Sequence, residues 1–396
     1  MADAQPETTI LALNSGSSSL KFGLYRVAAQ RIEALVTGEA ESLGGLGGEF
    51  HARDAGGTPL AGSGEAVADQ GAVLVRIAHL LADGAFPAPV AIGHRIVHGG
   101  PKLRRHCLID PSVLRALEAA IPFAPLHIPP ALSVIRLAQA QFPGLPQAAC
   151  FDTQFHADLP DVARVLPIAK ALQSEGVQRY GFHGLSCESI VDQLARDLPR
   201  RLVIAHLGNG TSVTAVKGGA SIDTSMGLTP TGGVIMGTRS GDLDPGVLVY
   251  LIREKKFDAA KLEDLVNRQS GLLGISGVDS DMRRLHEAAP SDANARLAIE
   301  MFCYSVLKQL AAMIAALGGA DMIVFTGGIG ENDAAARAAI CGGLEWIGVS
   351  LDAARNRSVA NPISDAASRC LVLVLPSQED EQIARHTWAL ACGDRA

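Results

Sequence analysis

Residues 11 to 22 read Leu-Ala-Leu-Asn-Ser-Gly-Ser-Ser-Ser-Leu-Lys-Phe, an apolar strand that runs into a serine- and glycine-rich turn and then a lysine. The backbone N–H groups, the serine hydroxyls and the Lys21 ammonium can converge on an anion, as glycine-rich turns do around phosphates. A tight hairpin whose serines only satisfy their own backbone is the alternative. The stretch therefore predicts a strand–turn–strand unit with phosphate as its candidate ligand.

Two later segments have the same pattern. Residues 202–216 form an apolar strand, a turn of Gly, Asn, Thr and Ser, and an alternating strand. Residues 322–332 form a buried strand and a glycine-rich turn, before an alanine-rich helix that starts near Asp333. The repetition predicts a duplicated α/β domain with a cleft between the copies. Glycine loops between strands and helices are where α/β folds hold nucleotides.

Local signals place further elements between these segments. Two strands are expected within 9–27, and short strands and loops within 36–60. Asp110 followed by Pro111 is an N-cap signal, which predicts a helix to about Ala120. A second helix is expected at 130–141. A short strand is expected at 148–151, and it ends at a candidate domain boundary near Asp152.

Composition narrows the function class. The chain has 396 residues, 48% of them hydrophobic, which favours two compact α/β domains. The net charge is −7 and no basic run exceeds two residues, so neither nucleic acid nor a membrane surface is an expected partner.

Compartment signals point to the cytoplasm. The N-terminal residues are polar and acidic, unlike a signal peptide. The apolar segment 301–317 is interrupted by Lys308 and Gln309, which predicts a buried helix rather than a membrane span. The seven cysteines are odd in number and form no Cys-x-x-Cys pair, so neither a disulfide framework nor a thiolate metal site is expected.

The common catalytic motifs are absent from the sequence: P-loop, dinucleotide fingerprint, His-Glu-x-x-His and Gly-x-Ser-x-Gly. Arg95 follows an apolar strand beside a Gly-Gly pair, where it can hold a carboxylate or phosphate bidentately; a surface ion pair is the alternative. Segments 125–128, 151–156 and 180–184 each hold a His or Asp among apolar residues, which is also typical of core histidines. Loop 223–245 is long enough to suggest function, and its Arg239 could stabilise charge in phosphoryl transfer.

Eight segments together resemble the acetate and propionate kinase family of the actin, sugar-kinase and heat-shock ATPase superfamily, in family order over nearly the whole chain. They are 14–21, 93–95, 151–153, 180–184, 206–210, 223–230, 236–242 and 328–332. The resemblance implies two duplicated ribonuclease-H-like (actin-like ATPase) domains with a central cleft. It implies a first domain of residues 1–151 plus 381–396. The second, 152–380, is expected to carry most nucleotide contacts and the interface of a homodimer.

The resemblance implies that ATP phosphorylates acetate to acetyl phosphate and ADP, reversibly and by direct in-line transfer. Such transfer needs positioning and positive charge. Arg95, Arg239 and His183 are then the expected catalytic groups around the carboxylate and the transferring phosphoryl group. Asp152 has a proton donor or acceptor role in the family, yet acetate is already ionised at neutral pH. We expect Asp152 to orient Arg95 or a metal-bound water.

The family pattern also implies cofactor and substrate contacts. Mg²⁺, with Mn²⁺ as an alternative, is expected at Asn14 and Glu379, because oxygen ligands suit it. The expected ATP contacts are Ser17, Ser19, Lys21, His206, Leu207, Gly208, Asn209, Gly210, Asp281, Met282, Arg283, Gly328, Ile329, Gly330, Glu331 and Asn332. The expected acyl pocket is Val97, Leu126, Phe182 and Pro230. The β-branched Val97 favours acetate over propionate by the modest margin of one methylene, about 1 to 3 kcal/mol.

The chain departs from the family pattern at Ile128, Leu185, Cys187 and 231–233, none of which is assigned to chemistry. Because Ile128 and Leu185 adjoin histidines, these departures bear on histidine orientation and acyl specificity. Three alternatives stay open from sequence: a propionate or butyrate kinase, a nucleotide-binding sensor of the same fold without catalysis, and, more remotely, a dehydrogenase.

Overall fold

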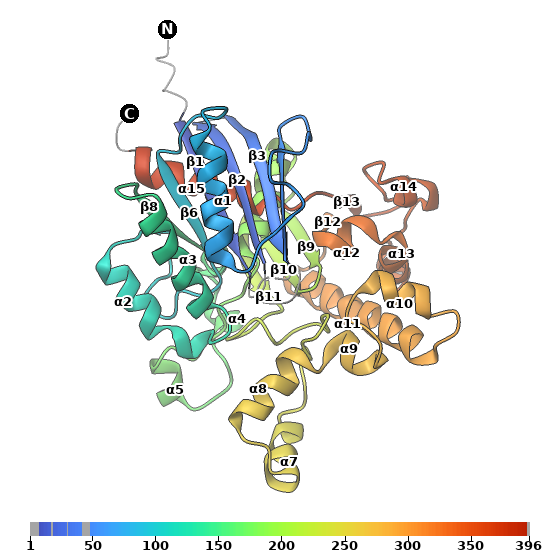
Figure 1. Cartoon of the computed structure of the whole chain (residues 1–396). Helices are drawn as coiled ribbons and strands as arrows, with labels where there is room; N and C mark the ends of the chain where they lie inside the picture. The colour runs from blue at the N-terminus through green and yellow to red at the C-terminus, as the bar shows by residue number, and fades with distance from the viewer. Residues whose placement is uncertain (1–7, 17–18, 30, 42–47, 394–396) are drawn as a thin grey trace. The chain divides into compact units, whose positions relative to one another are not determined.

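The computed structural model describes residues 8–16, 19–29, 31–41 and 48–393. The chain divides into two compact units, drawn in Figure 1. Unit 1 is Met1–Gln154 with Gln378–Ala396, and unit 2 is Phe155–Ser377. Residues 152–154 and 378–380 thus lie in unit 1, although the expected domain limits assigned them to the second domain. The reason is local, since Asp152 bonds to Arg95 and Asp380 to Asn14.

Unit 1 contains an eight-stranded sheet of order β5-β4-β3-β2-β1-β6-β8-β7. β1 pairs antiparallel with β2 and parallel with β6, which in turn pairs parallel with β8. The strands are β1 (Thr8–Ser15), β2 (Leu20–Ala28), β3 (Arg31–Glu41), β4 (Glu49–Asp54), β5 (Glu65–Ala66), β6 (Ala91–Ile96), β7 (Cys107–Leu108) and β8 (Gln147–Phe151).

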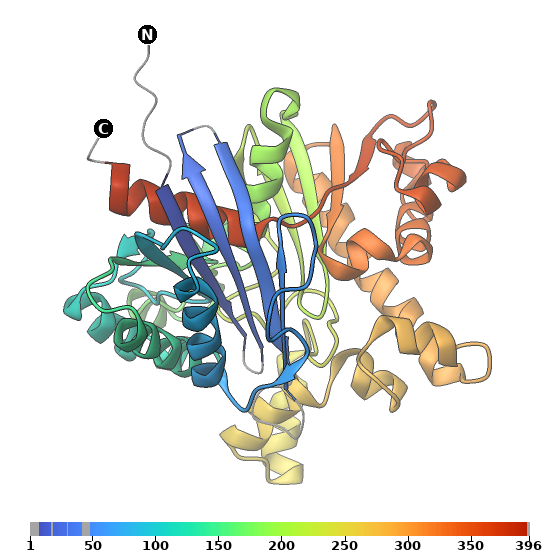
Figure 2. The same ribbon diagram turned by 45° about the horizontal axis from the view of Figure 1, so that its top comes forward.

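Helices cover both faces of this sheet because successive strand residues point to opposite faces. Ile92 packs in a core cluster with side chains of α1 (Gln70–Ala82) and α3 (Ile128–Gln141). Its neighbour Gly93 faces α15 (Glu379–Cys392), the red helix that lies across the strands in Figure 2. A Cβ at Gly93 would lie 2.1 Å from Thr387 Oγ1, so glycine permits this close approach.

Unit 2 contains a five-stranded sheet of order β11-β10-β9-β12-β13. β9 pairs antiparallel with β10 and parallel with β12, which pairs parallel with β13. The strands are β9 (Arg201–Leu207), β10 (Thr211–Lys217), β11 (Ala220–Thr224), β12 (Met322–Thr326) and β13 (Leu371–Val374). Val203 packs on the face of α11 (Ala293–Leu317), and Ile204 on the face of α6 (Gly184–Leu194).

The two sheets share a strand arrangement. Strands β3-β2-β1-β6-β8 in unit 1 match β11-β10-β9-β12-β13 in unit 2, with antiparallel pairing on one side of the third strand and parallel pairing on the other. The expectation of duplicated α/β halves is confirmed.

The other helices connect and flank these sheets. They are α2 (Pro111–Ala119), η1 (Ile121–Phe123), η2 (Gln154–His156), α4 (Asp161–Arg164), α5 (Lys170–Ser174), η3 (Ala195–Asp197), α7 (Pro245–Lys255), α8 (Ala259–Arg268), α9 (Gly271–Ser276), α10 (Met282–Ala288), α12 (Gly327–Asn332), α13 (Ala334–Gly342), η4 (Glu345–Ile347) and α14 (Ala353–Ser358).

Most expected elements are found, with two corrections. α2 starts at Pro111 after an Asp110 cap, as predicted. α3 begins at Ile128 rather than Pro130, since prolines are accommodated in a first helical turn. The glycine-rich segment 327–332 is the short helix α12 rather than a turn. Its first N–H group is satisfied within the helix, where Glu331 Oε1 accepts from Gly327 N. Its last carbonyls accept hydrogen bonds from Arg337 of the next helix, α13.

The apolar segment around 301–317 is part of α11. Among the described residues, this helix is long and apolar enough to cross a membrane. In the structure, Phe302, Val306 and Leu310 of α11 lie in the core of unit 2. The prediction of a buried helix holds for this face, whereas Leu297, Met301 and Tyr304 on the same helix are exposed.

Candidate active site

In unit 1, polar side chains meet where parallel strands end. Asn14 is near the end of β1, Arg95 near the end of β6, and Asp152 directly after β8. Because β1, β6 and β8 are parallel, their carboxyl ends lie at one edge of the sheet. This is the edge where open α/β sheets hold ligands.

Arg95 is clamped by Asp152. Its Nε lies 3.0 Å from each carboxylate oxygen and its Nη2 donates to Oδ2 at 2.6 Å. Its Nη1 donates to Asn14 Oδ1 at 3.1 Å. Asp152 is 1% exposed, so water contributes little to solvating this carboxylate. The guanidinium plane is therefore fixed by hydrogen bonds on two of its edges.

The first turn of α15 brings two more carboxylates to this edge. Asn14 Nδ2 donates to Asp380 Oδ1 at 2.9 Å and to Glu379 Oε2 at 3.3 Å. Carboxylates in a first helical turn are favoured by the positive end of the helix dipole. Asn14 consequently links Arg95 to the start of α15.

This unit 1 cluster carries more negative than positive charge. Burial raises the pKa of Asp380, as does the nearby Glu379, while the hydrogen bond from Asn14 opposes the rise. Burial also raises the pKa of Asp152, against the opposing effect of Arg95. Burial disfavours the charged Arg95, but the surrounding carboxylates outweigh it and raise the pKa of Arg95. An oxygen-rich cluster with excess negative charge suits a hard divalent cation.

In unit 2, His183 is held at a strained backbone position. It has φ of 57° and directly precedes α6. Its Nδ1 lies 3.0 Å from Ser212 Oγ, and its ring stacks on His206 at a centroid distance of 4.1 Å. His206 in turn pairs with Ser186 through Nδ1 at 2.8 Å. Non-glycine residues in this left-handed region are typical of functional sites.

Arg239 approaches the β9–β10 turn beside this histidine. Its Nη1 donates to the Pro230 carbonyl at 2.6 Å. A Cβ at Gly210 would lie 2.7 Å from Arg239 Nη2 and 3.1 Å from His183 Nε2. The absence of a side chain at Gly210 therefore brings the guanidinium and the imidazole to the same turn.

A cavity of about 1000 Å³ opens in unit 2 beside the two glycine-rich segments. Eight of the expected ATP contacts line it: Gly208, Asn209, Asp281, Met282, Arg283, Gly328, Ile329 and Asn332. Ser280, His286 and Asp333 complete the lining. Asp281 and Arg283 form an ion pair at 2.6 Å at its edge. The volume and the backbone-rich wall suit a nucleoside-sized ligand.

The other expected nucleotide contacts that the structure describes are not among the residues that line this cavity. Glu331 Oε1 accepts from the N–H groups of Gly327 and Ser377, each at 3.0 Å, so its carboxylate holds α12. In unit 1 the Lys21 ammonium lies 3.8 Å from Glu39, and both side chains are exposed. Ser19 closes the turn after β1 by accepting from Gly16 N, whereas Ser17 lies outside the described residues.

The expected acyl-pocket residues are divided between the units. Val97 and Leu126 are half-buried in unit 1. In unit 2, Pro230 and Phe182 are buried, and Phe182 O lies 3.0 Å from His156 Nε2.

Sequence reasoning missed several residues that hold these groups. Asp380 lies closer to Asn14 than the expected ligand Glu379 does. Ser212 orients His183 and Ser186 orients His206. Ser212 was detectable, because it lies in the strand after a turn already assigned to the nucleotide. Asp380 was not distinguishable from its acidic neighbours until the helix placed them.

Comparison with known proteins agrees with this arrangement. Residues 9–385 match the family model of the acetokinase family. The chain is 43% identical to an acetate kinase of Nitrobacter hamburgensis over 390 residues, which is 96% of either chain. Among solved structures, a propionate kinase from Francisella tularensis superposes with a TM-score of 0.90 at 37% identity, covering 97% of this chain and 100% of that one. An acetate kinase from Porphyromonas gingivalis superposes with a TM-score of 0.84 at 35% identity, covering 97% of this chain and 99% of that one.

Proposed function

Because the chain belongs to the acetokinase family, we propose that it transfers the γ-phosphoryl group of ATP to acetate, reversibly, giving acetyl phosphate and ADP. The observation that carries the proposal is the clamped guanidinium of Arg95 beside an acidic, oxygen-rich cluster. In unit 2, Arg239 and His183 meet at the turn next to the nucleotide-sized cavity. Such fixed cationic and hydrogen-bonding groups are what phosphoryl transfer requires.

The step itself needs no proton transfer. An oxygen of the ionised acetate attacks the γ-phosphorus, and the bond from that phosphorus to the bridging oxygen of ADP breaks. Negative charge spreads over three equatorial phosphoryl oxygens. By similarity to the family, Arg95 in unit 1 and Arg239 and His183 in unit 2 are the groups that we propose to stabilise this charge.

We assign Asp152 to orientation rather than to acid or base catalysis. Its two oxygens already accept three N–H contacts from Arg95. A carboxylate engaged in this way fixes the guanidinium plane, and the ionised substrate has no proton to remove. Orientation of this kind accounts for much of the rate of an in-line transfer.

The unit 1 cluster fits a divalent cation. Asn14, Glu379 and Asp380 offer amide and carboxylate oxygens, and Asp380 is partly buried without a cationic hydrogen-bond partner among its described contacts. Mg²⁺, or Mn²⁺ in its place, would neutralise phosphate charge when bound. Asn14 and the start of α15 would hold it.

The nucleotide is assigned to the 1000 Å³ cavity of unit 2. The proposal that Lys21, Ser17 and Ser19 contact its phosphates rests on the resemblance to the family alone. We also propose that the protein forms a homodimer through unit 2 and that it acts in the cytoplasm.

Acetate is the proposed acyl substrate, with propionate as the alternative that the similarity to a propionate kinase favours. Val97 decides between them, because a β-branched residue leaves little room beyond a methyl group. The discrimination expected from one methylene is about 10- to 200-fold.

The test is formation of acyl hydroxamate from ATP, Mg²⁺ and acetate, propionate or butyrate. The proposal predicts the highest kcat/KM with acetate and a shift toward propionate in Val97→Ala. Equal kcat/KM for all three acids would contradict the acyl assignment. ATP binding without acyl phosphate from any of them would instead indicate a nucleotide sensor.

A further inference from the structure

Arg337, on α13, is a fully buried cation that none of the preceding assignments uses. Its side chain is 1% exposed and is the largest of the fully buried side chains described. Burial lowers the pKa of Arg337, which means that the surroundings disfavour its charge. A buried guanidinium persists only where its donors are satisfied.

All four described hydrogen bonds of the Arg337 side chain run to amide oxygens. Nη1 donates to the carbonyls of Gly330 and Glu331 at 2.8 and 3.0 Å. Nε donates to Asn356 Oδ1 at 2.8 Å, and Nη2 to the Asn356 carbonyl at 2.7 Å. The guanidinium therefore bridges α12 to α14.

The carbonyls of residues 330 and 331 belong to the last turn of α12. Carbonyls at a helix end have no partner within the helix and carry the negative end of its dipole. The Arg337 guanidinium donates hydrogen bonds to these carbonyls, and its positive charge lies at the negative end of the helix dipole. Meanwhile Gly328, Ile329 and Asn332 of the same short helix line the 1000 Å³ cavity. Arg337 thus holds a wall of that cavity from behind without touching its interior.

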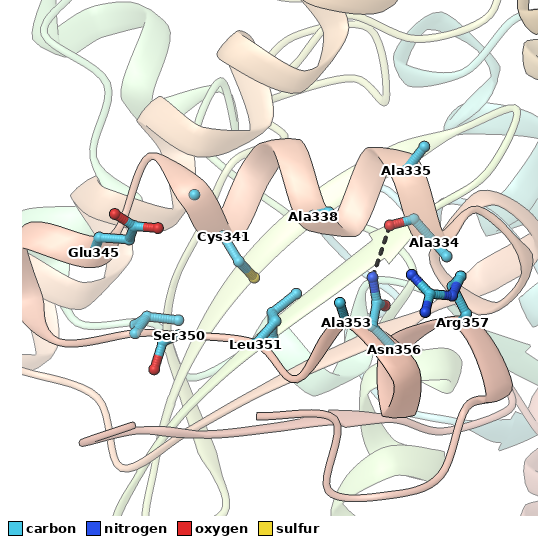
Figure 3. Close-up of a pocket in the computed structure, with 12 residues that line it drawn as sticks. Ala334, Ala335, Ala338, Cys341, Glu345, Ser350, Leu351, Ala353, Asn356 and Arg357 are labelled. Carbon is cyan, nitrogen blue, oxygen red and sulfur yellow. Dashed lines mark hydrogen bonds between the residues drawn. The ribbon is translucent and has the colours of Figure 1, made fainter. Parts of the chain in front are cut away.

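Asn356 anchors the other edge of the guanidinium. Its Nδ2 donates to the Ala334 carbonyl at 2.8 Å, the contact drawn in Figure 3. Asn356 also lines a second cavity of about 510 Å³ between α13 and α14. Shortening this side chain therefore enlarges a space that already exists.

We propose that Arg337 and Asn356 are positioning residues for the nucleotide, because together they fix the α12 wall against which ATP and ADP bind. This inference rests on the proposed function and adds residues to it. Neither residue belongs to the expected acyl pocket. Loosening the pair therefore weakens nucleotide binding and leaves the apparent affinity for acetate unchanged.

The test compares Asn356→Ala, Asn356→Asp and Arg337→Lys with wild type. Asn356→Ala removes the acceptor for Arg337 Nε, while Asn356→Asp keeps an oxygen there. Arg337→Lys keeps the positive charge, but a single ammonium nitrogen replaces the three guanidinium nitrogens that make the four hydrogen bonds. We expect the KM for ATP and the calorimetric Kd for ADP to rise about tenfold in Asn356→Ala and Arg337→Lys. In Asn356→Asp the Kd for ADP should stay within about threefold of wild type, and the KM for acetate should stay constant throughout.

The matched control is Arg201→Lys. Arg201 bonds to Asp321 and to the Gly318 carbonyl, at the end of β12 opposite α12. Its replacement should lower thermal stability without changing the Kd for ADP. Unchanged ADP affinity in a folded Asn356→Ala, or an equal loss in Arg201→Lys, would overturn the inference. If Arg337→Lys does not fold, the comparison of the Kd for ADP between Asn356→Ala and Asn356→Asp still tests the inference.

The ADP measurement also separates the two proposals. A wild-type protein that binds ADP but forms no acyl phosphate contradicts the proposed function alone, and the variants are still judged by their Kd for ADP. Acyl phosphate formation with unaltered ADP binding in Asn356→Ala overturns the inference alone.

Discussion

Replacing Arg95 by alanine should destabilise unit 1 as well as abolish activity. The change leaves Asp152, which is 1% exposed, without the three N–H contacts that Arg95 makes to it. Removing one partner of a buried ion pair costs about 3 to 5 kcal/mol. For a unit of this size each kcal/mol lowers Tm by about 2 to 4 °C, so a fall of roughly 6 to 20 °C is expected.

The double variant Arg95→Ala/Asp152→Asn should recover more than half of that stability, because the orphaned charge is gone. It should recover no activity, because the guanidinium is still missing. Urea unfolding and thermal scans of both single variants and the double variant give the coupling free energy, expected at about 2 kcal/mol.

Arg26→Ala is the matched control in the same sheet. Arg26 pairs with Glu33 at 3.1 Å, but each side chain is 37% exposed and reached by water, so its loss should cost under about 1 kcal/mol. Additive stability losses in the double variant, or an Arg95→Ala variant as stable as Arg26→Ala, would refute the energetic argument. Restored activity in the double variant would refute the argument that catalysis needs the Arg95 guanidinium.

Three further outcomes follow from individual contacts. Ser212→Ala should lower kcat about tenfold with little change in the KM for ATP, since His183 loses the partner of its Nδ1. Gly210→Ala should lower kcat at least tenfold, because the new Cβ would displace the groups around it; Gly227→Ala, with open space at its Cβ, should be neutral. Burial lowers the pKa of His94 to about 4, so folding favours its neutral form and this stability is lost as pH falls from about 6.5 toward 4. The stability difference between wild type and His94→Gln, measured by urea unfolding, should therefore shift by about 2 kcal/mol against wild type between pH 7 and pH 5; a constant difference would contradict the assignment.

Much of the site could be predicted from local patterns. Asn14, Arg95 and Asp152 each follow or end an apolar run, and parallel strand ends share an edge. The local pattern does not show which residues of α15 lie against which residues of the sheet. The hydrogen bond between Asn14 and Asp380 joins residues 366 positions apart. Its existence depends on α15 packing across β1 and β6, so neighbouring acidic residues were indistinguishable in the sequence.

The glycine-rich segment at 327–332 shows the opposite failure. Its composition predicts a turn, because glycine is unfavourable in helices. Contacts from Arg337 and Ser377, together with a bond within the helix from Gly327 N to Glu331 Oε1, override that preference and stabilise α12. A buried arginine in an alanine-rich helix was the available signal, but its partner Asn356 is 19 residues away and could not be identified from spacing alone.

The transfer itself is tested most directly with acetate labelled with ¹⁸O in both carboxylate oxygens, supplied with ATP and Mg²⁺. Attack by the carboxylate on the γ-phosphorus predicts acetyl phosphate whose bridging oxygen carries the label, seen as an isotope shift of its ³¹P resonance, together with unlabelled ADP. Release of pyrophosphate with label in AMP, or unlabelled inorganic phosphate as the only phosphoryl product, would contradict direct transfer to acetate.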